Sequence, residues 1–116
     1  MLRTKLRTAL TAAMKRRDAA AVSALRSALA AIDNAEAVDP AHTPAPGTSA
    51  TIAGAVTGLG AAEVPRLHLT EDQIEAIVRT EIAERLRAAE QHDALNIPDR
   101  AARLRAEAGA LNAELP

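Results

Sequence analysis

The sequence predicts an all-α protein with four main helices, arranged as two helical hairpins or as an antiparallel bundle. A long flexible linker is expected between the second and third helices. Large aliphatic residues recur at three- and four-residue spacing, as they do along one face of a helix. Alanine is abundant and has the highest helix propensity. Proline and glycine gather between Val38 and Leu69, where they interrupt regular structure.

The first two helices form the amino-terminal pair, residues 1–37. The first is expected from about Leu2 to Arg16, with an apolar face of Leu2, Leu6, Leu10 and Met14 or Ala13. The second follows Asp18, whose carboxylate suits an N-cap position, and runs to about Ala37. Its apolar face comprises Val22, Leu25, Leu29 and Ile32.

The third helix has the clearest start signal. Thr70 and Gln73 have the spacing of a capping box, and Leu69 with Ile74 has the spacing of a hydrophobic staple. The expected apolar face continues through Ile77, Val78 and Ile82, and fades through Leu86.

The fourth helix is expected to start near Asn96 to Asp99, because Pro98 suits a first helical turn. Its seam comprises Leu104, Ala108, Leu111 and Leu115. The third and fourth helices make the second pair, residues 70–116, and residues 38–69 are the linker of a single helical domain.

Three charge pairs have the spacing of surface ion pairs on helices, worth about 0.2–0.5 kcal/mol each. They are Glu75 with Arg79, Glu81 with Arg85, and Arg103 with Glu107.

The chain of 116 residues fits one domain, but much of its 48% hydrophobic content is alanine. Burying a large aliphatic side chain contributes about 1.5–3 kcal/mol, and ordering each residue costs about 1–2 kcal/mol of backbone entropy. A marginal monomer is therefore expected, or one stabilised by self-association or by a partner.

Composition excludes several classes of site. The chain has no cysteine, which excludes disulfides and thiolate chemistry, and no apolar run long enough for a membrane span. A cytoplasmic protein without a membrane partner is expected. Phe, Tyr and Trp are also absent, so RNA binding would depend on phosphates and shape instead of base stacking on aromatic rings.

No catalytic constellation is visible. The sequence has three histidines, His42, His68 and His92, and they do not have the spacing of metal ligands. It also contains no phosphate-binding glycine loop and no nucleophile–base pair. We therefore expect no catalytic residue, no metal and no cofactor-binding residue.

Basic residues dominate the amino-terminal segment although the net charge is −1. All of them precede the first acidic residue, Asp18, and they are candidate contacts to tRNA or another anion: Arg3, Lys5, Arg7, Lys15, Arg16 and Arg17. The structural alternative is that the last three close a helix whose carboxyl end favours cations.

Arg26 flanks the apolar seam of the second helix and has two interpretations. It could bury its stem and pair with a carboxylate of a facing helix, such as Glu81. Alternatively, it could meet an external anion together with Arg3 or Arg7.

Four stretches together resemble the GatB/YqeY family of small bacterial proteins. They cover nearly the whole chain outside the linker: LRTKLRTALTAAMKRRD at 2–18, VSALRSALAAIDNAEA at 22–37, LTEDQIEAIVRTEIAERLRAAEQ at 69–91 and DRAARLRAEAGALNAELP at 99–116. Members usually continue past the closing Leu-Pro with a small helical module similar to the tail of GatB. This sequence ends at Pro116, so the resemblance covers the amino-terminal helical domain. The linker is also longer than the family's.

The resemblance implies a link to tRNA-dependent amidotransferases, which are carbon–nitrogen ligases that use glutamine as amido donor. The implied partners are tRNA or a component of the amidotransferase or aminoacyl-tRNA machinery. Three hypotheses follow: a noncatalytic accessory that touches tRNA phosphates, a helical protein–protein interaction module without an RNA role, and a free-standing amide-forming enzyme.

Overall fold

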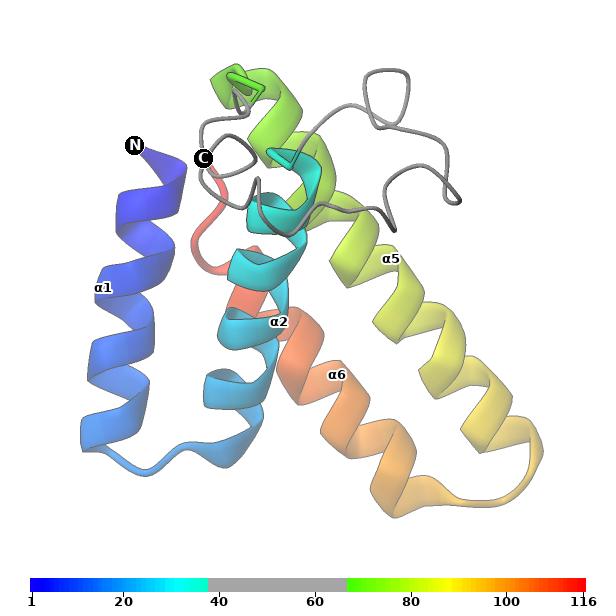
Figure 1. The fold of residues 1–116 in the computed structure, drawn as a ribbon. Coiled ribbons are helices and arrows are strands. Elements are labelled where there is room, and N and C mark those ends of the chain that lie inside the picture. Colours follow the sequence, from blue (N-terminus) through cyan, green and yellow to red (C-terminus); the bar gives the residue numbers. More distant parts are fainter. Residues whose placement is uncertain (38–66) are drawn as a thin grey trace, which may run out of the picture. The chain divides into compact units, whose positions relative to one another are not determined.

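The computed structural model describes residues 1–37 and 67–116. These ranges contain four helices and no strand, which confirms the all-α prediction for them (Figure 1). The helices are α1 (Leu2–Lys15), α2 (Ala19–Ala35), α5 (Glu71–Ala94) and α6 (Pro98–Asn112). Positions 38–66 of the predicted linker lie outside the described residues.

The chain divides into two compact units. One comprises Met1–Asp33 with Leu69–Pro116, and the other comprises Asn34–His68. In the second unit, the backbone N–H of Leu67 donates to the carbonyl oxygen of Glu36 at 3.0 Å. The first unit contains α1, α5, α6 and most of α2.

The turn between α1 and α2 reverses the chain through a left-handed residue, Arg17, with φ of 57°. Its N–H donates to the carbonyl of Met14 at 3.2 Å, and the N–H of Asp18 donates to that of Ala13 at 3.0 Å. These two bonds form a Schellman motif, which satisfies the last carbonyls of α1. Asp18 then accepts a 3.1 Å bond from the N–H of Ala21, which confirms it as the N-cap of α2.

The turn between α5 and α6 repeats this arrangement. Asn96 has φ of 60°, and its N–H donates to the carbonyl of Asp93 at 3.0 Å. The N–H of Ile97 donates to the carbonyl of His92 at 2.9 Å. Pro98 follows in the first turn of α6, as the sequence predicts.

The start of α5 has the predicted capping box. The N–H of Gln73 donates to Thr70 Oγ1 at 3.1 Å, and the N–H of Thr70 donates to Gln73 Oε1 at 2.8 Å. The next residue of the turn, Glu71, also serves α1: its Oε1 accepts from the N–H of Leu2 at 2.9 Å. The first turn of α5 therefore caps two helices.

Aliphatic side chains from all four helices form the core. The fully buried large side chains are Leu6, Leu25, Ile32, Val78 and Leu111. On α1, Ala13 is buried whereas Met14 is 50% exposed, so the apolar face passes through Ala13. Of the predicted staple residues, Ile74 belongs to this core and Leu69 is partly buried against it. Alanines that the apolar spacing did not select complete the α2 face: Ala21, Ala24 and Ala28.

The α5–α6 hairpin extends the fold with a much thinner interior. Ala89, Ala101 and Ala108 are buried there but lie outside the aliphatic core. Leu86 is 44% exposed and Leu95 is 68% exposed. The predicted apolar face of α5 therefore ends before Leu86.

Candidate functional site

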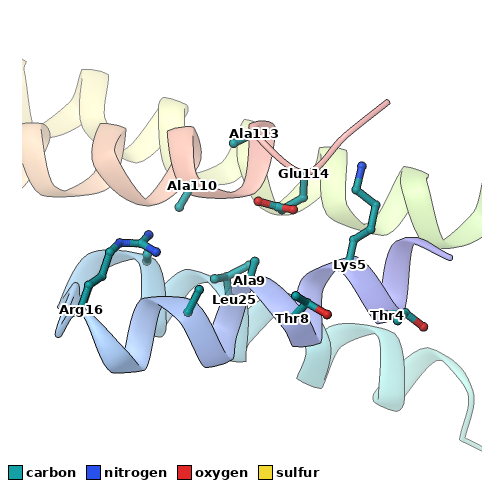
Figure 2. A pocket seen from close by; sticks show the side chains of 11 residues that line it. Thr4, Lys5, Thr8, Ala9, Arg16, Leu25, Ala110, Ala113 and Glu114 are labelled. Carbon is teal, nitrogen blue, oxygen red and sulfur yellow. The ribbon is translucent and has the colours of Figure 1, made fainter.

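A groove of about 460 Å³ lies among α1, α2 and α6 (Figure 2). Small and apolar side chains make most of its surface, and charged side chains stand at its rim. The lining residues are Thr4, Lys5, Thr8, Ala9, Ala12, Arg16, Ala21, Leu25, Ala110, Ala113 and Glu114.

The helical repeat of α1 explains the cationic rim. Lys5 and Arg16 are eleven residues apart, which is about three turns, so both side chains lie on one side of α1. In Figure 2 they stand toward opposite ends of the groove, and Ala9 lies between them on α1. Glu114, which follows α6, supplies a carboxylate on the opposite wall. The groove thus has a small-residue floor, two cations on one wall and one anion on the other.

The structure distributes the other basic candidates around α1. Arg3 is partly buried, whereas the remaining six candidates, including Arg26, are exposed. Arg3 and Arg7 are one turn apart and share a face different from that of Lys5 and Arg16. Arg17 occupies the α1–α2 turn. The run of basic residues in the sequence is therefore not one surface in the fold.

Arg26 does not pair with Glu81, and that interpretation is wrong. Glu81 Oε1 instead accepts a 2.9 Å bond from Ser27 Oγ and a 2.9 Å bond from Arg85 Nη1. A serine one position along α2 reaches the carboxylate, while Arg26 is exposed and its side chain forms no hydrogen bond or ion pair with the described residues. Contact of Arg26 with an external anion stays a prediction.

Of the three expected surface ion pairs, Glu81–Arg85 is largely buried, whereas in the Arg103–Glu107 pair only Glu107 is buried, because the Arg103 side chain is 49% exposed. Arg85 Nε lies 3.0 Å from Glu107 Oε1, and Arg103 Nε lies 3.1 Å from Glu107 Oε2. The side chains of Glu81, Arg85 and Glu107 are only 13–15% exposed. These residues form a charge network between α5 and α6, and Ser27 connects it to α2. The Glu75–Arg79 pair, at 2.7 Å, is more exposed, as expected of a surface pair.

Arg103 also brings α6 to the α1–α2 turn. Its Nη2 donates to the carbonyl of Ala19 at 3.3 Å, at the start of α2. This places a guanidinium from α6 close to the turn that carries Arg16 and Arg17. The sequence pattern predicts only the ion pair of Arg103 with Glu107, because the contact with Ala19 spans 84 positions.

Three exposed carboxyl groups have shifted pKa values, and each shift has a structural cause. The N–H of Ala21 lowers the pKa of Asp18, and the N–H of Leu2 lowers the pKa of Glu71. The hydrogen bond from Arg105 lowers the pKa of Asp93. All three carboxylates cap helices or connect them, which accounts for their lowered pKa values.

The described residues bring no three metal-ligating side chains together. His92 Nδ1 lies 2.8 Å from the carbonyl of Ala88 at the end of α5, and His68 is exposed. His42 lies outside the described residues. Among the helices described, none combines the length and apolarity that crossing a bilayer requires.

No protein-family model, no curated protein and no solved structure matches this chain.

Proposed function

We propose that the protein is a noncatalytic helical accessory of a tRNA-dependent amidotransferase system, which touches tRNA phosphates through its basic side chains. The observation that carries the proposal is the α1–α2 turn. Lys15, Arg16 and Arg17 are consecutive and exposed there, and Arg103 of α6 is anchored beside them at Ala19. Guanidinium groups gathered from two elements suit a phosphate backbone.

The resemblance to the GatB/YqeY family supports the choice of tRNA. The absence of aromatic residues from the sequence is compatible with this kind of binding, because phosphate contacts need no base stacking. The interaction is expected to depend on salt and to read shape instead of sequence.

The test is tRNA binding across a salt series. If three arginines contact phosphates, the affinity should fall about 20- to 40-fold between 50 and 200 mM salt. Arg16→Glu combined with Arg17→Glu should weaken binding and flatten the salt dependence. Arg87→Glu combined with Arg100→Glu, at exposed positions of α5 and α6, changes the net charge by the same amount and is the matched control that should have a smaller effect. Absent or salt-independent binding would remove the tRNA part of the proposal.

The noncatalytic part has its own test. The purified protein, supplied with glutamine, ATP and misacylated tRNA, should form no amide product. Amide formation that depends on this chain would favour the free-standing enzyme instead.

The second candidate function is a helical protein–protein interaction module without an RNA role. The groove favours it, because small apolar side chains from three helices lie together at the surface there. Binding of a helical partner in the groove, with no affinity for tRNA at low salt, would favour this function over the first.

A further inference from the structure

The groove has the length and the small side chains that a binding site for a helix requires. From Thr4 to Arg16, α1 advances about 18 Å, which equals about three helical turns. Ala9 and Ala12 face the groove from α1, and Ala110 and Ala113 face it from α6. Small side chains on both walls allow another helix axis to approach closely. The groove is therefore better suited to an apolar helix face than to a polar small molecule.

The charges at the rim indicate the polarity of the occupant. Lys5 is exposed, and its side chain forms no hydrogen bond or ion pair within residues 1–37 and 67–116. Arg16 has an ion pair with Asp18, but both side chains are well exposed, at 58% and 41%, so the pair is weak and exchangeable. Carboxylates of a partner can therefore pair with both cations along the α1 wall.

A second copy of this chain fits the groove poorly. Two α1 helices packed antiparallel about a two-fold axis near Ala9 and Ala12 would place Lys5 opposite Arg16 of the second copy. The two-fold axis would create two such Lys5–Arg16 contacts, and each would bring like charges together, which disfavours association. The same two positions favour a partner helix that carries acidic residues.

We propose that this groove docks a helix of a partner protein. The packing face of that helix consists of small apolar residues, and its flank beside α1 carries two carboxylates about three turns apart. Its other flank, which meets Glu114, carries no acidic residue. This inference goes beyond contact with tRNA phosphates, because the groove can be occupied whether or not tRNA binds.

The probe is a synthetic alanine–glutamine helix of about 16 residues with glutamates eleven positions apart. Its counterpart carries lysines at the same two positions. In an NMR titration of the full chain, the acidic peptide should shift the backbone amides of Ala9, Ala12, Ala110 and Ala113. It should bind at least about tenfold more tightly than the lysine peptide, which corresponds to a difference of about 1.4 kcal/mol.

A charge exchange tests the assigned cations. Lys5→Glu combined with Arg16→Glu should invert the preference, so that the lysine peptide binds more tightly. The matched control is Arg7→Glu combined with Lys15→Glu, two exposed positions of α1 outside the groove, and it should keep the acidic preference. An unchanged preference after the Lys5 and Arg16 exchange would overturn the proposal.

A change of shape provides an independent test. Ala12→Leu fills the groove at an exposed position, and it should weaken the acidic peptide at least about tenfold. Ala106→Leu, exposed on α6 outside the groove, should leave binding unchanged. Equal effects of the two leucines would contradict docking in the groove, and so would peptide shifts that map elsewhere or no shift at about 1 mM peptide.

The failures of the two proposals can be told apart. Ala12→Leu should leave tRNA binding intact, and Arg17→Glu should leave peptide binding intact. Salt-dependent tRNA binding without any peptide binding would contradict the groove proposal and leave the tRNA proposal standing. Peptide binding without tRNA binding would contradict the tRNA proposal and leave the groove proposal standing.

Discussion

Along α5, the side chains that face the other helices change from aliphatic to alanine. In residues 71–82, Ile74 and Val78 are buried in the core together with Leu111 of α6. In residues 83–94, Ala89 is buried and Leu86 is 44% exposed. We call residues 71–82 with 110–112 the inner half of the hairpin, and residues 83–109 the outer half.

The two halves are held together by different forces. The inner half buries branched side chains against α1 and α2, and each of these contributes about 1.5–3 kcal/mol. The outer half packs alanines, which bury little area, and depends on helix propensity, a Schellman turn and charge pairs. The Arg85–Glu107 and Arg105–Asp93 pairs lie in the outer half. One pair of helices therefore combines a hydrophobic segment with a polar one.

The largest expected effect comes from removing one leucine in each half. Leu111→Ala leaves a cavity in the inner half, where the side chain is fully buried, and should cost about 2–5 kcal/mol of unfolding free energy. Leu86→Ala in the outer half should cost less than about 1 kcal/mol, because that side chain is already half exposed. Urea denaturation followed by circular dichroism measures both, and equal losses would contradict the distinction.

The next effect concerns carboxylates. Glu107→Ala leaves Arg85 and Arg103 without their shared carboxylate and should cost about 1–3 kcal/mol, because Glu107 and Arg85 are largely buried. Glu75→Ala in the inner half removes an exposed pair with Arg79 and should cost about 0.2–0.5 kcal/mol. Double-mutant cycles with Arg85→Ala and Arg79→Ala isolate the two pair energies. A coupling as small for Arg85–Glu107 as for Arg79–Glu75 would show that the buried network adds nothing.

The two hairpin turns provide a smaller comparison. Arg17→Gly should raise stability by about 0.5–1 kcal/mol, because glycine adopts the left-handed conformation without the Cβ penalty. Asn96→Gly should gain only about 0–0.5 kcal/mol, since asparagine tolerates that conformation. Arg17→Ala removes the same charge without relieving the backbone and is the control in thermal melts. A melting temperature for Arg17→Ala as high as that of Arg17→Gly would contradict the backbone explanation.

The smallest effect is expected from acid. The pKa values of Asp18, Glu71 and Asp93 are lowered in the folded state. Their stabilisation is therefore complete above the ordinary carboxyl pKa of about 4 and is lost as the pH falls through the lower, folded-state values. Asp18→Asn and Asp93→Asn should each flatten the loss of stability between about pH 5 and pH 3. An acid profile that neither substitution changes would contradict these assignments.

The helices themselves could be predicted because their signals are local. Thr70 with Gln73, Asp18 and Pro98 each act within one turn of helix, and the structure confirms all of them. The choice between Ala13 and Met14 could not be made from spacing, since it depends on how closely α1 approaches its neighbours. The buried alanines of α2 could not be predicted either, because alanine is common both on surfaces and where helices pack closely.

The candidate site was predictable only in part. The eleven-residue interval places Lys5 and Arg16 on one side of α1, which the helical repeat alone can indicate. Ala110, Ala113 and Glu114 join them from about a hundred positions away, through the packing of α6. The largely buried position of Glu107 likewise depends on this packing, so its pairs with Arg85 and Arg103 could not be distinguished from surface pairs.

Native-state amide hydrogen exchange tests most directly whether the two halves of the hairpin are held differently. The amides of Val78 and Leu111 are expected to exchange only through global unfolding, with the full free energy of unfolding that urea denaturation measures. The amides of Ala89 and Ala101 should exchange through local opening of the outer half, at a clearly lower free energy. Equal protection at all four positions would contradict the account.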